Sequence, residues 1–282
     1  MKHQTQDIPV VLTIAGSDSS GGAGIQADIK TISATGSYAC SVITAVTAQN
    51  TQGVDAVHPL PADIVGQQLD SVLNDLNVVA VKIGMLSQPD IIEVIAEKLS
   101  IFQPRWLVID PVMISTSGTH LLEPSATGIL KNILLPMADL ITPNLPEALM
   151  LTSHAESDCL PAMPLLTEQL RKIHPKGILL KGGHSEDKNF CEDLLITPDE
   201  QFSFKSERIT TSNTHGTGCT LSSAIASFLA QGNTLYDAVA LAKTFISAAI
   251  SNADRLCVGQ GKGPVHHFHA FYQSLSGPGT KR

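Results

Sequence analysis

Residues 213–230 read N-T-H-G-T-G-C-T-L-S-S-A-I-A-S-F-L-A. Gly216, Thr217 and Gly218 are unsuited to the interior of a helix or strand, whereas the apolar residues at 221–229 recur at spacings of three and four. The pattern predicts a glycine turn that opens an amphipathic helix at about Cys219. The first backbone N–H groups of a helix lack partners within it, and the helix dipole adds partial positive charge there, so this turn can receive an anion.

The cysteine at the start of this helix adds an ionisable group. A thiol at a helix start is favoured as the thiolate, because that end of a helix favours negative charge. We therefore expect Cys219 to stand at the mouth of an anion-binding turn. An ordinary turn with a helix cap fits the same residues, since Gly and Thr are common capping residues.

The composition describes a folded protein with no general affinity for polyanions. The 282 residues suffice for a large core, and 43% hydrophobic against 16% charged residues argue against disorder. A net charge of −8 without a basic run argues against nucleic acid or an anionic membrane as a partner. The five cysteines form no C-x-x-C pair, so we expect reduced thiols and a cytoplasmic protein. We expect neither a signal peptide nor a membrane span, because the first apolar run is short and is interrupted by Asp18.

Strand and helix patterns alternate along the chain. We expect strands at 10–15, 41–47, 78–83, 106–109, 140–141 and 177–181, helices at 25–34, 62–76, 91–99, 125–134, 147–151, 168–173, 219–230 and 235–250, and a hairpin of 194–196 with 202–204. This alternation predicts an α/β fold with a mostly parallel sheet covered by helices on both faces, as a single domain of residues 1–282.

Polar residues and glycines follow the expected strands. They are Gly16, Gln49, Gly84, Asp110, Asn144 and Gly182. In open α/β sheets, ligands bind at the carboxyl ends of the strands, so these loops are expected to point at one shared crevice.

Two other motifs suggest ligands but fit them poorly. The run Gly22-Ala23-Gly24-Ile25-Gln26-Ala27 matches G-x-G-x-x-A between a strand and a helix, as in dinucleotide-binding loops, but Gln49-Asn50 stands where that motif needs an acid. The C-terminal run His266-His267-Phe268-His269 could suggest a metal. Since no cysteine or acid pattern completes a site, we expect these histidines to be solvated.

Charged residues of the crevice allow both structural and functional interpretations. Asp110 can hold Mg²⁺ or close a turn. Asn144 and Glu147 fit a capping box, or can face a metal-bound triphosphate. Lys181 can meet a phosphate. Lys243, the only cation in an apolar helix, is expected by default to extend its ammonium to water, with the anion site as the alternative.

Long matches in sequence order carry a family resemblance over almost the whole chain. They are T-I-A-G-S-D-S-S-G-G-A-G-I-Q-A-D-I-K from Thr13, S-V-I-T-A-V-T-A-Q-N-T from Ser41, K-I-G-M-L from Lys82, I-T-P-N-L-P-E-A from Ile141, L-K-G-G-H from Leu180, N-T-H-G-T-G-C-T from Asn213 and G-P-V-H-H-F-H-A from Gly263. On these motifs the chain resembles the hydroxymethylpyrimidine/phosphomethylpyrimidine kinases of thiamine biosynthesis, in the ribokinase-like superfamily. Residues 153–164 are less similar to the family.

The resemblance implies a ribokinase-like fold, a homodimer, and ATP- and Mg²⁺-dependent phosphorylation of 4-amino-5-hydroxymethyl-2-methylpyrimidine and then of its monophosphate. It assigns catalysis to Cys219, Gly218 and Gly216, with Cys219 as the base where most of the superfamily has an Asp. It assigns pyrimidine contacts to Gly16, Asp28, Gln49, Met85 and Val112, nucleotide contacts to Lys181, Lys243, Asn144 and Thr217, and metal binding to Glu147 and Asp110.

These residue types suit that chemistry, although the sequence leaves alternatives open. Gln49 can donate and accept together along an aminopyrimidine edge, and Met85 and Val112 can cover the ring. Cys219 can take the hydroxyl proton or can be a spectator, because phosphoryl transfer needs little help from a base. A nicotinamide-dependent oxidoreductase and a non-catalytic pyrimidine-binding protein remain as rival functions. Acceptance of pyridoxine-like alcohols and the relative rates of the two phosphorylations stay undetermined.

Overall fold

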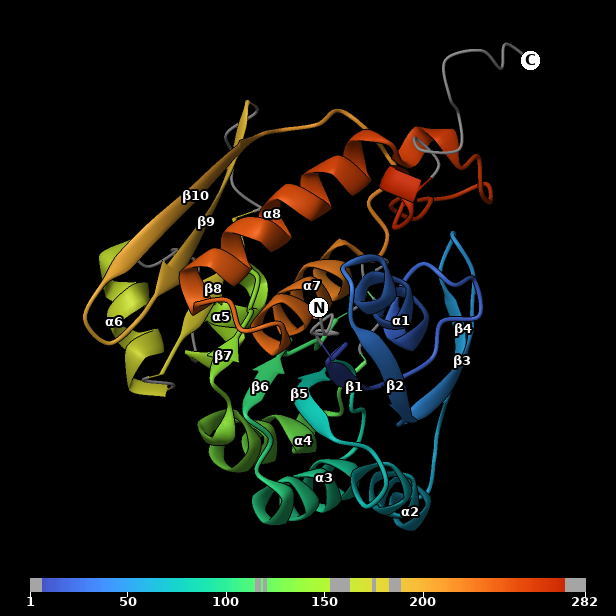
Figure 1. Cartoon of the computed structure of the whole chain (residues 1–282), viewed down its shortest axis with the longest axis vertical. Helices are drawn as coiled ribbons and strands as arrows, with labels where there is room; N and C mark the ends of the chain where they lie inside the picture. The colour runs from blue at the N-terminus through green and yellow to red at the C-terminus, as the bar shows by residue number, and fades with distance from the viewer. Residues whose placement is uncertain are drawn as a thin grey trace, which may run out of the picture.

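One eight-stranded sheet runs through the molecule (Figure 1). The computed structural model describes residues 7–114, 118, 121–152, 163–173, 176–182 and 189–271. The strand order is β10-β9-β8-β7-β6-β5-β1-β2. The strands are β1 (Val10–Ala15), β2 (Tyr38–Ile43), β5 (Val78–Ile83), β6 (Trp106–Ile109), β7 (Leu140–Ile141), β8 (Ile178–Leu180), β9 (Phe190–Ile196) and β10 (Gln201–Glu207). Neighbouring strands pair in parallel from β2 through β1, β5, β6 and β7 to β8, whereas β9 and β10 pair antiparallel. The predicted mostly parallel sheet is therefore confirmed.

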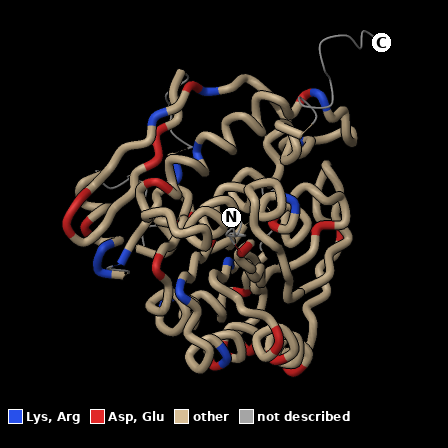
Figure 2. The backbone as a smooth tube through the Cα atoms, viewed as in Figure 1, with Lys and Arg blue, Asp and Glu red and all other residues tan. Residues whose placement is uncertain are grey.

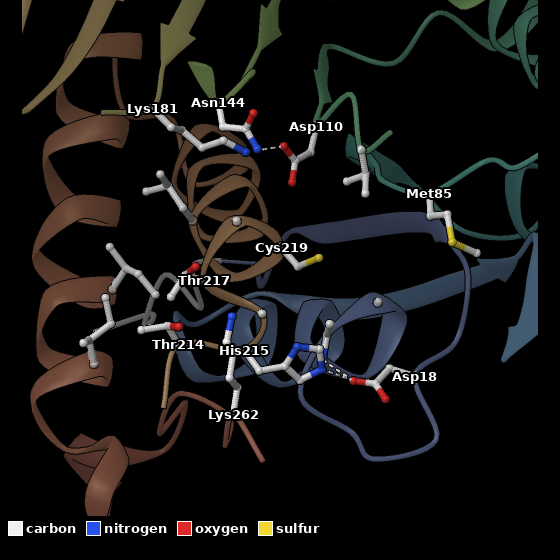
Figure 3. A pocket seen from close by; sticks show the side chains of 18 of the residues that line it. Asp18, Met85, Asp110, Asn144, Lys181, Thr214, His215, Thr217, Cys219 and Lys262 are labelled. Atoms are coloured by element: carbon white, nitrogen blue, oxygen red, sulfur yellow. Dashed lines mark hydrogen bonds and ion pairs between the residues drawn. The ribbon is translucent and has the colours of Figure 1, made fainter. Parts of the chain in front are cut away.

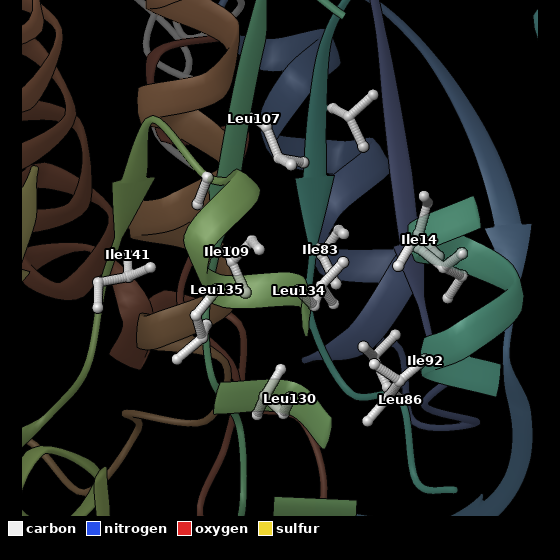
Figure 4. Close-up of a cluster of buried hydrophobic side chains, with 14 of the residues drawn as sticks. Ile14, Ile83, Leu86, Ile92, Leu107, Ile109, Leu130, Leu134, Leu135 and Ile141 are labelled. Carbon is white, nitrogen blue, oxygen red and sulfur yellow. The ribbon is translucent and has the colours of Figure 1, made fainter. Parts of the chain in front are cut away.

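Helices cover both faces of this sheet, because neighbouring strand residues point to opposite faces. On β1, Val11 belongs to one core cluster and Leu12 to the other. The Val11 side is covered by α1 (Gly24–Ala34), α7 (Thr217–Ala230) and α8 (Leu235–Ser251). The Leu12 side is covered by α2 (Ala62–Leu73), α3 (Pro89–Phe102), α4 (Pro124–Ile129), α5 (Leu145–Leu151) and α6 (Met163–Ile173), and Figure 4 shows part of its core. A π-helical turn (Leu130–Leu134) and a 3-10 turn (Leu135–Met137) continue α4.

The expected strand at 41–47 is divided between two strands, because residues 41–43 belong to β2 and residues 45–47 to β3 (Ala45–Gln49). The chain leaves the main sheet after β2, because buried Thr44 donates its N–H to the Ala15 carbonyl (3.0 Å) and its hydroxyl to the Met85 carbonyl (2.7 Å). It continues as β3 (Ala45–Gln49), which pairs antiparallel with β4 (Val54–Pro59) in a separate two-stranded sheet. This hairpin brings Gln49 to the carboxyl edge of the main sheet from a different element than predicted.

The expectation that the C-terminal histidines are solvated is also wrong, because this segment folds back onto α7. His267 is buried and its Nε2 lies 3.0 Å from the Thr220 hydroxyl, and burial lowers the pKa of His267 to about 3. The His269 ring packs on Phe245 of α8, with 5.3 Å between ring centroids. Within the described ranges, no group of three His, Cys, Asp or Glu side chains could hold a metal ion.

Charged side chains are scattered over the chain. In the view of Figure 2, positions of Lys and Arg and positions of Asp and Glu are both spread over the visible part of the chain. In the part of the chain that the structure describes, no helix is long and apolar enough to cross a membrane.

Candidate active site

The loops that follow the strands share one pocket of about 720 Å³, as the sequence predicts (Figure 3). Thirteen of the fourteen predicted site residues line it, and Asp28 is the exception. The thirteen are Gly16, Gln49, Met85, Asp110, Val112, Asn144, Glu147, Lys181, Gly216, Thr217, Gly218, Cys219 and Lys243. We call the part of the pocket at Gln49 the Gln49 end and the part at Lys181 and Lys243 the lysine end. The start of α7 lies between these two ends.

Helix α7 begins at Thr217, two residues before the predicted start. Its N-cap, Gly216, has a φ of +79°, which L side chains rarely adopt. A Cβ atom at Gly216 would also collide with the Gly22 carbonyl oxygen, so this turn is pressed against the loop that follows β1. Among the described residues no side chain caps this end of α7. The Thr217 N–H donates to the Thr214 carbonyl (3.4 Å), and the next N–H groups, those of Gly218 and Cys219, are available to an anion in the pocket.

A cluster of opposite charges lies against this helix start. The Lys181 Nζ is 2.7 Å from Asp110 Oδ1 and 3.8 Å from Glu147 Oε2. A Cβ atom at Gly218 would lie 3.3 Å from the Lys181 Nζ and 3.4 Å from Asp110 Oδ2, so only a glycine leaves space between the helix and the cluster. Burial alone would lower the pKa of Lys181, but the charges of Asp110 and Glu147 outweigh it and raise that pKa. Lys181 is therefore a permanent cation beside the helix start.

Asn144 and Glu147 form a structural contact with each other and also lie at the pocket. The Glu147 N–H donates to Asn144 Oδ1 and the Asn144 N–H donates to Glu147 Oε2, both at 2.8 Å, so the capping box is confirmed. Both residues also line the pocket. Burial, with the charge of Asp110, raises the pKa of Glu147 to about 7 against the opposing effect of Lys181. A dication beside this carboxyl would favour its ionised form.

Lys243 does not extend to water, so that default expectation is wrong. Its Nζ lies 2.7 Å from Asp193 Oδ2, and the ammonium side chain is 12% exposed and lines the pocket. Asp193 Oδ1 accepts from the Gly182 N–H at 2.8 Å, which joins α8 to the segment after β8.

Sequence reasoning missed the apolar wall of this end of the pocket. It consists of Ile209, Leu221, Ile246 and Ile250. The spacing of four between Ile246 and Ile250 on α8 is the signal that could have indicated it.

The other end of the pocket brings Gln49, Gly16, Met85 and Val112 together. A Cβ atom at Gly16 would collide with the Met85 methyl group, so the side chain of Met85 covers the bare backbone at Gly16. Gln49 Oε1 lies 3.2 Å from the Thr47 hydroxyl, whose hydrogen is shared with the Ser17 carbonyl at 2.8 Å. This end thus offers one amide between apolar surfaces, as an aminopyrimidine ring would need.

Asp28 lies beneath the pocket, and its expected contact with the substrate is corrected. It is fully buried and its oxygens accept from the Lys82 ammonium (2.9 and 2.8 Å), the Thr13 hydroxyl (2.6 Å) and the Ser223 hydroxyl (2.7 Å). These donors belong to β5, β1 and α7. Asp28 therefore fastens α7 to the sheet.

The expected thiolate at Cys219 is also corrected. Burial raises the pKa of Cys219 to about 11, although the Lys82 charge and a hydrogen bond from the Gly24 N–H act in the opposite direction. Desolvation thus outweighs the helix start, and at neutral pH the side chain is a thiol.

The structure adds a buried pair that sequence reasoning missed, formed by Asp18 and His215. His215 Nε2 lies 2.7 Å from Asp18 Oδ2, across 197 residues of sequence. The same carboxylate accepts from the N–H groups of Gly22 (3.0 Å) and Ala23 (2.7 Å). These two N–H groups belong to the loop that matches the dinucleotide-binding motif, and the side chain of Asp18 in the same loop already accepts from them. No signal in the sequence connects Asp18 with His215.

The comparisons with known proteins agree on one family. The family model described as phosphomethylpyrimidine kinase matches residues 18–266. A hydroxymethylpyrimidine/phosphomethylpyrimidine kinase of Rhizobium meliloti is 50% identical over 94% of this chain and 98% of its own, and one of Escherichia coli is 49% identical over 93% and 98%. A crystal structure of phosphomethylpyrimidine kinase from Clostridium difficile (46% identity, TM-score 0.75) covers 86% of this chain and 99% of its own. A Bacillus subtilis pyridoxal kinase in complex with ADP (34% identity, TM-score 0.84) covers 94% and 99%.

Proposed function

The chain belongs to the phosphomethylpyrimidine kinase family, and on that premise we propose that it uses ATP to phosphorylate 4-amino-5-hydroxymethyl-2-methylpyrimidine to the monophosphate and then to the diphosphate, in thiamine biosynthesis. Both reactions need an acceptor and a triphosphate to meet at a site that stabilises the transferring group. The observation that carries the proposal is the uncapped start of α7 between the Gln49 end and the lysine end of one pocket.

At the acceptor end, Gln49 pairs with the ring edge that carries the amino group, and Met85 and Val112 cover the ring. An amide both donates and accepts, which matches a neighbouring amino group and ring nitrogen. The contact with Thr47 supports this role, because the Gln49 oxygen faces the Thr47 hydroxyl and the NH₂ group therefore points away from Thr47. The ring substituent then extends towards α7.

At the nucleotide end, the apolar wall of Ile209, Ile246 and Ile250 receives the adenine, and the lysines receive the phosphates. Lys181 and Lys243 support this assignment, since both line the pocket on the same side as that wall and each is already held by a carboxylate. Side chains that are oriented in advance lose little freedom when the ligand binds.

The transfer step takes place at the start of α7. The hydroxymethyl oxygen forms a bond to the γ-phosphorus while the bond from that phosphorus to the β–γ bridging oxygen breaks, and ADP leaves with that electron pair. In the second reaction an oxygen of the monophosphate is the attacking atom. The backbone N–H groups of Gly218 and Cys219 stabilise the charge on the transferring group. The thiolate form of Cys219 takes the hydroxyl proton. Because the pKa of Cys219 is about 11, only a small fraction of the molecules carries this thiolate at neutral pH.

Mg²⁺ fits the carboxylates of this cluster. Mg²⁺ in phosphoryl-transfer sites is held by one or two carboxylates together with substrate phosphates and water. Glu147 and Asp110 supply two such carboxylates, and a dication beside Glu147 would offset the burial that raises the pKa of this carboxyl. When bound, Mg²⁺ supplies positive charge that neutralises the phosphates.

We also propose a homodimer that forms through β2 and the β3–β4 hairpin. β2 is an edge strand, and such edges are commonly covered by another chain. Tyr38 and Val46 are 58% and 49% exposed on these elements. The single domain of residues 1–282 is supported by the two core clusters on either side of one sheet, and the cytoplasmic location stays a prediction. Light scattering of the wild type and of Val46→Glu tests the dimer, and a monomeric wild type would contradict it.

The test of the function is incubation of the protein with MgATP and a panel of aminopyrimidine and pyridoxine-type alcohols, with product masses as the measurement. We expect the pyrimidine alcohol to gain one phosphate and then a second. A protein that binds the pyrimidine without converting it would support the binding-protein alternative. A product oxidised with a nicotinamide cofactor would support the oxidoreductase alternative.

A further inference from the structure

His215 occupies the position between the Gln49 end of the pocket and the start of α7. Its Nε2 is 2.7 Å from Asp18 Oδ2 and 3.5 Å from Gln49 Nε2, and the residue directly precedes Gly216. Figure 3 shows the ring between Asp18 and the part of the pocket that holds Cys219. His215 is 7% exposed, and that exposed part lines the pocket. A pocket ligand that extends from Gln49 towards α7 therefore passes this ring.

The ring is held firmly in this place. A Cβ atom at Gly22 would collide with the imidazole, so the loop after β1 packs directly against it. The His215 N–H donates to the Gly263 carbonyl (3.0 Å), and the His215 carbonyl accepts from the Val265 N–H (3.4 Å). Two separate segments, the loop after β1 and residues 263–265, thus hold its side chain and its backbone.

Asp18 provides a permanent negative charge behind the ring. It accepts from the Ser20 N–H (2.9 Å) and the Ser20 hydroxyl (2.8 Å), as well as from Gly22, Ala23 and His215. Although burial acts in the opposite direction, the hydrogen bonds from His215 and Ser20 lower the pKa of Asp18 to about 2. Because an ionised carboxylate only accepts, His215 Nε2 carries the hydrogen of their bond. The opposite side of the imidazole remains for a group in the pocket.

The two reactions of the proposed function place different demands on this position. The first acceptor is a neutral alcohol, whereas the second carries a phosphate dianion that must approach the γ-phosphate of ATP. Lys181 and Lys243 stand at the nucleotide end and are held there by Asp110 and Asp193. His215 is a basic side chain that contacts Gln49, where the acceptor ring binds in our proposal, and Lys262 also lines the pocket.

We propose that His215, held by Asp18, binds the phosphate of the monophosphate acceptor, so that one pocket can serve both phosphorylations. The inference rests on the proposed function and deepens it. An imidazolium has an N–H on both ring nitrogens, so the ring can donate to a phosphate oxygen through Nδ1 while Nε2 stays on Asp18. The second acceptor thereby gains a charge-assisted hydrogen bond at a position where the first acceptor, a neutral alcohol, needs none.

The test is His215→Gln, with kcat/KM measured separately for the alcohol and for the monophosphate. Glutamine can still donate to Asp18 but cannot become a cation. We expect the loss for the monophosphate to exceed the loss for the alcohol by roughly tenfold to hundredfold, which is the range for one hydrogen bond to a charged group. Equal losses for the two acceptors would overturn the inference. Any loss of folded protein cancels in this ratio.

The matched control is Lys30→Gln. Lys30 of α1 donates to the Gly21 carbonyl at 2.7 Å, so the variant removes a positive charge that lies against the same loop but outside the pocket lining. We expect it to affect both acceptors equally. A preferential loss for the monophosphate in this control would instead assign the effect to the general charge of the loop.

Calorimetry without ATP gives an independent readout. The ratio of the dissociation constants for the monophosphate and the alcohol should rise in His215→Gln by a similar factor, and an unchanged ratio would overturn the inference. A wild type that converts both pyrimidines but shows no selective effect of the variant would contradict only the role of His215. A wild type that phosphorylates neither pyrimidine would contradict the proposed function itself.

Discussion

The variant Gly218→Ala should leave the fold at the start of α7 intact while it lowers the rate of phosphoryl transfer there. Gly218 is the second residue of α7 and has no positive φ, so alanine fits its backbone. Alanine is favoured over glycine in a helix by about 0.5–1 kcal/mol. The new methyl group would lie 3.3 Å from the Lys181 Nζ and 3.4 Å from Asp110 Oδ2, contacts that are tight but need only small shifts. We therefore expect a melting temperature that is unchanged or higher by up to ~3 °C.

The same methyl group occupies the space in which the transferring phosphoryl group meets the helix start. Loss of one donor of such an anion site costs roughly 10²–10³ in rate, or about 3–4 kcal/mol. We expect kcat/KM to fall by that factor for both acceptors, measured by ADP release. Gly128→Ala is the control, since a Cβ atom at this α4 position meets nothing within 4 Å. A Gly218→Ala enzyme with full activity would refute the binding of phosphate at this turn.

The other predictions concern Gln49, Glu147 and Cys219. Gln49→Leu should weaken pyrimidine binding by roughly 1–3 kcal/mol in calorimetry while ATP binding stays intact, and unchanged pyrimidine affinity would remove Gln49 from the site. Burial raises the pKa of Glu147 to about 7, and a dication beside this carboxyl favours its ionised form, so MgATP binding near neutral pH should release protons in the wild type. Glu147→Gln should abolish this release and raise the Mg²⁺ concentration for half-maximal rate, whereas a change in melting temperature alone would leave only the capping role. Cys219→Ala should lower the turnover of the alcohol a hundredfold or more and flatten a wild-type rate with the alcohol that rises from pH 7 to 9, because the pKa of the thiol is about 11. An alanine variant within about threefold of the wild type would make Cys219 a spectator.

Local patterns predicted most of the sheet and the edge at which the pocket lies. The apolar β-branched runs of β1, β5 and β6 indicate strands buried on both faces, and such strands require parallel pairing under helices. Because parallel strands end at a common edge, the polar residues that follow them were expected in one crevice, and Asp110, Asn144 and Lys181 do lie in it.

Contacts between distant segments account for the residues that the sequence misplaced. Asp28 follows the glycine loop directly, but the face of α1 that carries it is set by the Lys82 ammonium 54 residues away. The helix start at Cys219 was visible in the sequence, whereas the burial that raises the pKa of its thiol depends on the packing of α7 against the sheet. Asp18 and His215 meet only because the turn before α7 is pressed against the loop after β1.

A crystal structure with the pyrimidine alcohol, Mg²⁺ and a non-hydrolysable ATP analogue tests the central claim most directly. We expect the γ-phosphate on the backbone N–H groups of residues 216–219, the pyrimidine edge on Gln49, and the hydroxymethyl oxygen about 3–3.5 Å from the γ-phosphorus, as an attacking atom must be. A γ-phosphate bound in the loop of Gly22 and Ala23, or a pyrimidine ring bound away from Gln49, would contradict the account.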